Sequence, residues 1–204
     1  GTGTYLYDKG VFINRCFEEL IFTNPELLTE VHRDYIKAGA DVIETNTFGA
    51  NRLKLAHHGL ESKVQEINAK ASKLAKDVAK DSTLVAGSVG PLGVQIEPLG
   101  KLSYDEAKEI FSEQIKGLLE GGVGLITFET FSLVEELVQG IRAVRELDAD
   151  IPIMAQVTIN NEGNLLSGES LERFVEQISK HRIDVIGLNC SVGPRLMLDA
   201  LERL

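Results

Sequence analysis

Short apolar runs alternate along the chain with longer segments in which apolar residues recur every three or four positions. The short runs are rich in Val and Ile and almost continuous in apolarity, which is typical of strands covered on both faces. Alternating strands and helices indicate an α/β fold with a parallel sheet and helices packed outside it. Six runs predict strands: Thr4–Tyr7, Asp41–Glu44, Leu84–Ser88, Leu125–Glu129, Ile151–Thr158 and Asp184–Cys190.

Several helices carry recognisable start signals. Asn24 and Pro25 supply a cap residue and a proline for the first turn. Two pairs have capping-box spacing, Ser103 with Glu106 and Ser132 with Glu135. Further helical segments are expected over Phe12–Leu20, Glu61–Lys80, Ser170–Lys180 and Pro194–Leu204, and His32 is expected on the surface of the first capped helix.

Two architectures fit this order of elements, an open doubly wound sheet and a (β/α)8 barrel. Six units are fewer than the eight of a barrel, so the count alone favours the open sheet. Polar residues nevertheless end nearly every strand, which is typical of a barrel whose site is assembled from all its βα loops. The sequence therefore predicts a partial (β/α)8 TIM barrel of about six units, forming one incomplete domain over residues 1–204.

Charge and cysteine content narrow the function classes. With 21 Lys and Arg against 31 Asp and Glu, the formal net charge is −10, which argues against a nucleic-acid or anionic-membrane surface. The longest apolar runs, such as Val123–Phe128, are far shorter than the roughly 20 residues of a membrane span. Two distant cysteines without a signal peptide indicate a reducing compartment, so we expect a cytoplasmic protein.

Motifs at the strand ends resemble the homocysteine S-methyltransferase domain family, in its methionine-synthase-type and reductase-fused branch. The resemblance covers the whole chain, and its specificity comes from several motifs in order rather than from any one of them. They are Asn24-Pro25-Glu26-Leu27, Glu44-Thr45-Asn46-Thr47-Phe48-Gly49, Ala86-Gly87-Ser88-Val89-Gly90-Pro91, Glu129-Thr130-Phe131 and Gly187-Leu188-Asn189-Cys190-Ser191-Val192-Gly193-Pro194.

The resemblance implies zinc-dependent methyl transfer to the thiol of homocysteine, giving methionine. Family members hold Zn²⁺ with three cysteine thiolates, and Cys190 matches the first of them. Glu129 matches the residue that binds the substrate ammonium, and Asn189 would brace the metal site. The methyl donor, methylfolate or methylcobalamin, would come from other modules. The remaining candidate substrate contacts are Thr130, Glu44, Asn46, Thr47 and Ser88. Hydrogen bonds between adjacent strands would explain Thr45, Asn46 and Thr47 equally well.

The sequence also departs from the family pattern. Cys190 is the one cysteine in a candidate zinc position, whereas a catalytic zinc keeps three protein ligands; Cys16 is expected to be a packing residue. We therefore expect a fragment truncated at both ends that binds zinc poorly and is inactive alone. Two alternatives stay open: methylation of another small thiol or selenol amino acid, and a non-catalytic scaffold domain.

Overall fold

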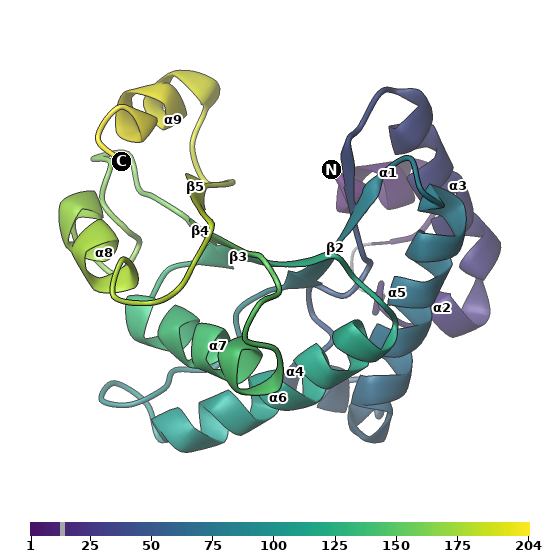
Figure 1. Cartoon of the computed structure of the whole chain (residues 1–204), viewed down its shortest axis with the longest axis horizontal. Helices are drawn as coiled ribbons and strands as arrows, with labels where there is room; N and C mark the ends of the chain where they lie inside the picture. The colour runs from purple at the N-terminus through teal and green to yellow at the C-terminus, as the bar shows by residue number, and fades with distance from the viewer. Residues whose placement is uncertain (13–14) are drawn as a thin grey trace. The chain divides into compact units, whose positions relative to one another are not determined.

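The computed structural model describes residues 1–12 and 15–204. The described chain forms two compact units, and each is described by itself (Figure 1). Unit 1 comprises Gly1–Ser88 with Glu113–Gly124, and unit 2 comprises Val89–Ser112 with Leu125–Leu204.

Unit 1 contains a parallel strand pair and most of the helices of the first half of the chain. Strands β1 and β2 pair in parallel with Val42 opposite Leu84 and Glu44 opposite Ala86. Its elements are α1 (Thr2–Asp8), α2 (Leu20–Thr23), α3 (Pro25–Lys37), β1 (Val42–Glu44), α4 (Arg52–Ala56), the 3₁₀ turn η1 (Glu61–Lys63), α5 (Val64–Ala79), β2 (Leu84–Val89, all but its last residue) and the second half of α6 (Tyr104–Glu120).

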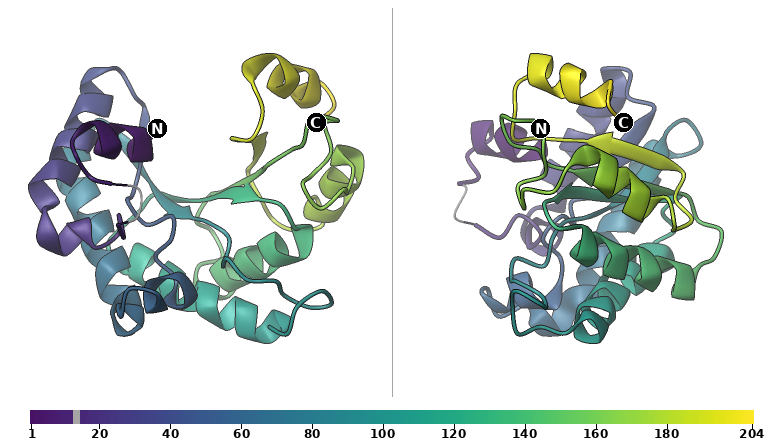
Figure 2. Two further views of the ribbon diagram at one scale, coloured as in Figure 1. Left: turned by 180° about the vertical axis from the view of Figure 1, so that it is seen from behind. Right: turned by 90° about the vertical axis from the view of Figure 1, so that its left-hand side faces the viewer.

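Helix α3 begins where the sequence predicts. The Asn24 side chain accepts a hydrogen bond from the Leu27 amide at 3.2 Å, and Pro25 occupies the first turn. Its apolar face is buried against α5, and the two helices lie side by side (Figures 1 and 2). Helix α6 approaches α5 closely at Gly117, where a Cβ would lie 2.7 Å from the Gln65 carbonyl oxygen. Glycine is therefore required at this crossing of the two helices.

Unit 2 contains three strands and the helices that follow them. Strand β4 lies between β3 and β5, with Ile126 opposite Ile153 and Val157 opposite Leu188. The elements are the first half of α6, β3 (Leu125–Phe131), α7 (Val134–Leu147), β4 (Ile153–Val157), α8 (Leu171–Ile178), β5 (Val185–Leu188) and α9 (Pro194–Leu201), which contacts β5 (Figure 2). Three rings, Phe111, Phe128 and Phe131, pack with centroids 5.7 to 6.3 Å apart and fix α6 against β3.

The first predicted strand is wrong, because Thr4–Tyr7 lies within helix α1. A four-residue apolar run does not distinguish a strand from a short helix by periodicity. In the structure Leu6 is fully buried in the helical cluster of unit 1, and the Tyr5 hydroxyl donates to Asp34 on α3 at 2.6 Å. The described residues hold five strands, and these match the other five predicted runs to within a few residues.

Two predictions about helix ends have opposite outcomes. The Ser103–Glu106 capping box is confirmed, since the Glu106 carboxylate accepts from the Ser103 amide at 2.9 Å. The Ser132–Glu135 box is wrong, because α7 begins at Val134 after Leu133, and the described atoms of Leu133 give that helix no side-chain cap. Leu133 keeps the extended conformation of β3, which postpones the helix by one residue.

His32 is not on the surface as predicted: it is 5% exposed in α3. The predicted helical run Phe12–Leu20 includes positions 13 and 14, which lie outside the described residues. Among the helices that the structure describes, none has the length and apolarity needed to cross a membrane.

Candidate functional site

The carboxyl ends of β1 and β2 in unit 1 are joined by a closed ring of hydrogen bonds. The Ser88 amide donates to the Thr45 hydroxyl at 3.0 Å, the two threonine hydroxyls are 2.6 Å apart, and the Thr47 hydroxyl donates to the Ser88 carbonyl at 2.7 Å. Because the Thr47 hydrogen is used on that carbonyl, the Thr45 hydroxyl must be the donor between the threonines. Thr45, Thr47 and Ser88 are 0 to 4% exposed, so the ring lies out of solvent.

Gln114 on α6 reinforces this ring, although it is not among the site residues predicted from the sequence. Its side-chain amide donates to the Thr47 carbonyl at 2.7 Å. The residue is fully buried between the apolar neighbours Phe111 and Ile115. A polar residue on an apolar helix stripe was the signal that could have revealed it, because such a residue needs a buried partner.

The other predicted site residues of unit 1 have different environments. Asn46 is half-buried and its side-chain amide donates to the Phe17 carbonyl at 2.6 Å, so it connects the end of β1 to the segment before α2. Glu44, at the end of β1, is exposed. The Gly49 amide of the same segment donates to the Glu18 carboxylate at 2.6 Å. Unit 1 thus brings Thr47 and Ser88 together, whereas the Asn46 amide binds elsewhere.

In unit 2, Asn189 links the carboxyl ends of β3 and β5. Its side-chain oxygen accepts from the Thr130 amide and its amide nitrogen donates to the Thr130 hydroxyl, both at 2.8 Å. The same nitrogen lies 3.4 Å from the Cys190 Sγ and donates to it. One side chain therefore fixes the residue after Glu129 and orients the thiol predicted to bind metal.

Backbone strain is concentrated at these two strand ends. Thr130, Cys190 and Ser191 have φ angles of 68°, 58° and 62°. This left-handed region is uncommon for residues other than glycine, and for a β-branched threonine it is a genuine outlier. Residues held in this way cost on the order of 1 to 3 kcal/mol each and cluster at functional sites.

Strand β4 completes the framework beneath this segment. The Thr158 amide donates to the Phe131 carbonyl at 2.8 Å, and the Asn189 amide donates to the Val157 carbonyl at 3.1 Å. Hydrogen bonds thus link the end of β3 to β4 and the end of β4 to β5. Glu129 lies half-buried on this framework, directly before Thr130.

The two cysteines are both free thiols in contrasting environments. Cys16 is 6% exposed, and burial, followed by the charge of Glu18, raises the pKa of its thiol to about 11. That environment suits packing and confirms the prediction for Cys16. Cys190 is exposed, as an accessible thiol ligand must be.

The described residues do not by themselves fit a zinc ion. Among residues 1–12 and 15–204, no three His, Cys, Asp or Glu side chains form a group that could hold a metal. A zinc centre needs three or four protein ligands. Cys190 can therefore supply one ligand, and the structure supports no chemical step through zinc.

The parallel strands carry a thiol, a carboxylate and strained backbone at their carboxyl ends. This arrangement is typical of α/β proteins that bind small molecules at this end of their strands. A family comparison then specifies the class. The chain matches the homocysteine S-methyltransferase family over residues 1–204 and belongs to that family.

Individual relatives agree with this assignment. Methionine synthases of Mycobacterium tuberculosis and Mycobacterium leprae are each 32% identical to the chain over 199 residues, covering 93% of it. The chain spans only 17% and 16% of the length of these two proteins. It is thus similar to a small part of each of them.

A solved structure confirms the fold class. The homocysteine methyltransferase MmuM from Escherichia coli, in a metallated form, superposes with a TM-score of 0.88 at 23% identity. The match covers 100% of this chain and 76% of MmuM. The chain accordingly has an α/β fold similar to that of this enzyme, and the match spans about three quarters of it.

Proposed function

We propose that this chain is the homocysteine-binding part of an enzyme that transfers a methyl group to the homocysteine thiol and forms methionine. The observation that carries the proposal is the Asn189 bridge, which fastens Thr130, next to Glu129, to the exposed thiol of Cys190. The strain at Thr130 and Cys190 supports it, because such conformations persist where function requires them. The family and the methionine synthase relatives supply the reaction class.

The roles of the individual residues follow from their chemistry. Glu129 is proposed to bind the ammonium group of homocysteine, since a half-buried carboxylate is stabilised by a cation. Thr130, Asn46 and Glu44 are proposed as further homocysteine contacts, whereas the Thr47 hydroxyl and the Ser88 backbone are buried and hold the ends of β1 and β2 together. Asn189 positions both Thr130 and Cys190.

In the reaction, the homocysteine sulfur forms a new bond to the methyl carbon. The bond between that carbon and the donor breaks, the donor retains the electron pair, and the thiol proton is released. The residues of this chain contribute mainly by positioning the substrate, which can supply a large part of such a rate enhancement.

Zinc and the methyl donor remain part of the proposal. Cys190 is proposed as one thiolate ligand of a Zn²⁺ ion whose other ligands lie outside this chain; when bound, zinc would favour the thiolate form of the substrate. Methylfolate or methylcobalamin is proposed as the donor, carried by other modules. Two free thiols are compatible with a cytoplasmic location, which we retain as the proposed compartment.

Titration of the chain with L-homocysteine in a calorimeter tests the substrate assignment. We expect Glu129→Gln to weaken binding at least about tenfold, as expected for a lost charge-assisted contact. Glu162→Gln, an exposed carboxylate of the same unit, is the matched control and should bind normally. 4-Mercaptobutanoate, which lacks the ammonium group, should bind weakly to the unaltered chain. Equal binding of the two thiols, or an unaffected Glu129→Gln variant, would refute the role of Glu129.

Methionine formation by the natural polypeptide that carries this chain tests the reaction. We expect Cys190→Ala to reduce the rate at least about 100-fold and to lower its zinc content, because the loss of a ligand impairs a catalytic metal site. A protein that contains no zinc and forms no methionine would instead indicate the scaffold alternative.

A further inference from the structure

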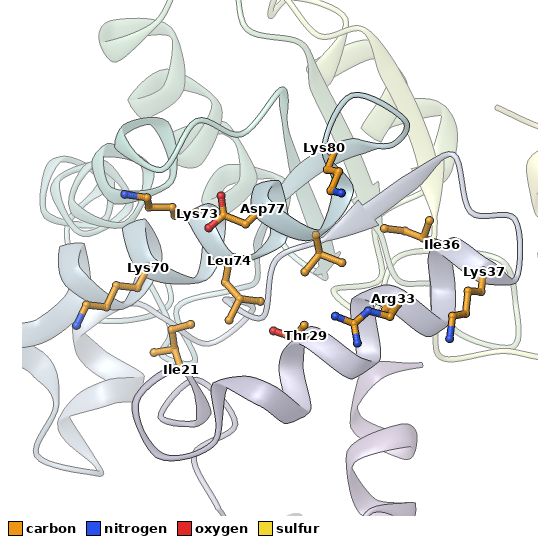
Figure 3. A pocket seen from close by; sticks show the side chains of 11 residues that line it. Ile21, Thr29, Arg33, Ile36, Lys37, Lys70, Lys73, Leu74, Asp77 and Lys80 are labelled. Atoms are coloured by element: carbon orange, nitrogen blue, oxygen red, sulfur yellow. The ribbon is translucent and has the colours of Figure 1, made fainter.

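A groove on unit 1 stands outside the site described above. It lies between α3 and α5, has a volume of about 750 Å³, and carries cations on both sides (Figure 3). Arg33 and Lys37 project from α3, and Lys70 and Lys73 project from α5, with Lys80 beyond the end of α5. We call these five residues and the apolar floor between them the cationic groove. Asp77 is the one acidic residue among those lining it.

The charge of the groove contrasts with that of the whole chain, which has a net charge of −10. Elsewhere cations are commonly paired with carboxylates, as in Arg52–Glu113, Lys108–Glu146 and Arg203–Glu172. In the groove, by contrast, Arg33, Lys73 and Lys80 form no ion pair with any residue that the structure describes. Three of the five groove cations thus lack a carboxylate partner among the described residues, whereas Lys37 pairs with Asp34 and Lys70 with Glu66.

Helix dipoles explain only part of this accumulation. A cation in the last turn of a helix is stabilised by the dipole, and Lys37 has that position on α3. Lys70 pairs with Glu66 at 2.8 Å and lies over the Phe22 ring. Neither reason applies to Arg33 or Lys73, which lie before the last turns of their helices. Favourable interaction with the helix dipole therefore does not account for the cations at Arg33 and Lys73.

The floor of the groove is apolar. Ile21, Ile36, Leu74 and Val78 line it, and the last three are only partly buried. An apolar strip with a row of cations on each side is complementary to an amphipathic helix whose apolar face is flanked by carboxylates. Lys70 and Lys80 are ten positions apart, which corresponds to roughly 15 Å or about three turns of a docked helix.

From this complementarity we propose that the cationic groove docks an acidic amphipathic helix of a partner protein. A second copy of the chain fits less well, because a symmetric dimer through this face would bring the cations of one groove against those of the other. A small anion also fits less well, because the cations form two separated rows and do not converge on one point (Figure 3).

The test uses a fluorescent synthetic helix of roughly 14 residues, with leucine on one face and glutamate elsewhere, titrated with the 204-residue chain at low ionic strength. We expect saturable binding that the Arg33→Glu/Lys73→Glu variant weakens at least about tenfold, as expected when two charge contacts become repulsive. The Lys101→Glu/Lys116→Glu variant carries the same charge change at exposed positions outside the groove and should retain binding. Circular dichroism checks that both variants are folded.

Methyl chemical shifts of the unaltered chain give a second measurement that needs no variant. Added peptide should shift Ile36, Leu74 and Val78 and leave the unit 2 core unchanged. The proposal is overturned if a scrambled peptide of the same composition binds equally, if both variants lose binding alike, or if no binding occurs. Displacement of the peptide by equimolar tripolyphosphate, indicating a small-anion site, would also overturn it, as would a dimer that dissociates in the groove variant.

Discussion

The strand ends of the two units use similar side chains in opposite ways. In unit 1, the Thr45, Thr47 and Ser88 ring is buried, and none of the three lies among the residues found at positive φ in the described chain. In unit 2, Thr130 and Cys190 have positive φ angles and are both hydrogen-bonded by the Asn189 side chain, and Cys190 is exposed. The two sets contain the same hydroxyl and amide chemistry but differ in access and strain.

This difference indicates that the ring in unit 1 stabilises the fold, whereas the strained segment in unit 2 is suited to binding. A closed ring of buried hydrogen bonds has each hydroxyl hydrogen committed, so it fixes strand register and offers little to a ligand. A strained, accessible segment stores free energy that the surrounding structure must supply, and it presents its groups in one fixed direction. We therefore expect mutations of the ring to change stability first, and mutations of the strained segment to change binding first.

The largest expected effect is a loss of stability in acid, caused by the buried His32 of unit 1. Burial lowers the pKa of its imidazole from 6.5 to about 4. Below pH 6.5 the unfolded chain binds a proton that the folded chain does not accept until about pH 4, so stability falls as pH falls through this window. Between pH 7 and pH 4 the loss from this group is about 3 kcal/mol.

Urea denaturation across this pH range measures the effect. His32→Leu should flatten the pH dependence by about 3 kcal/mol relative to the unaltered chain. Substitution of the exposed His58 by Gln should leave the profile unchanged. If the His32→Leu and unaltered profiles run parallel, the buried neutral histidine is not the cause.

Breaking the ring should have the next largest effect. Thr47→Val keeps the shape of the side chain but removes its hydroxyl. The Thr45 hydroxyl then loses its acceptor, and the Ser88 carbonyl loses the shorter of its hydrogen bonds but keeps the one from Gln114 at 3.5 Å. We expect a loss of about 2 kcal/mol in the free energy of unfolding, because unsatisfied buried groups are costly. Homocysteine binding should change less than stability.

Denaturation combined with amide hydrogen exchange would locate this loss, which should appear in β1 and β2. Thr29→Val is the matched control, since its hydroxyl serves only a carbonyl within α3 and its loss should cost less than about 0.5 kcal/mol. An equal cost for the two substitutions would contradict the special status of the ring.

Relief of strain in unit 2 should give the smallest effect, and one of opposite sign. Ser191 is exposed at a φ of 62°, so Ser191→Gly removes strain and should stabilise the chain by about 0.5 kcal/mol. Ser179→Gly, at a φ of −64°, relieves no strain and should destabilise it. A melting temperature that falls in both variants would contradict the proposed strain at Ser191.

Much of the fold could be predicted from sequence because its signals are local. The β-branched runs predicted five strands, and Asn24 and Ser103 marked helix starts, since a capping side chain and its amide partners lie within three residues. Thr4–Tyr7 failed because four apolar residues satisfy either period, and the packing of Leu6 decided the outcome. The Ser132 cap failed because Leu133 is still extended and the helix begins only at Val134.

The candidate site was predictable as residue identities but not as contacts. The motif around Asn189 and Cys190 was visible in the sequence, yet its hydrogen bonds reach Thr130, 59 positions away. Gln114 and His32 lie on helices whose buried faces depend on partners distant in sequence. For these residues, burial rather than residue type sets the chemistry.

By itself, the sequence determined most strand and helix periods, the helix caps at Asn24 and Ser103 and the family motifs, because each depends on residues close together along the chain. The tertiary structure decided which hydroxyls are committed within the ring, which thiol is exposed and which cations lack carboxylate partners. These properties depend on desolvation and on distances between segments remote in sequence, and they exist only after the chain has packed.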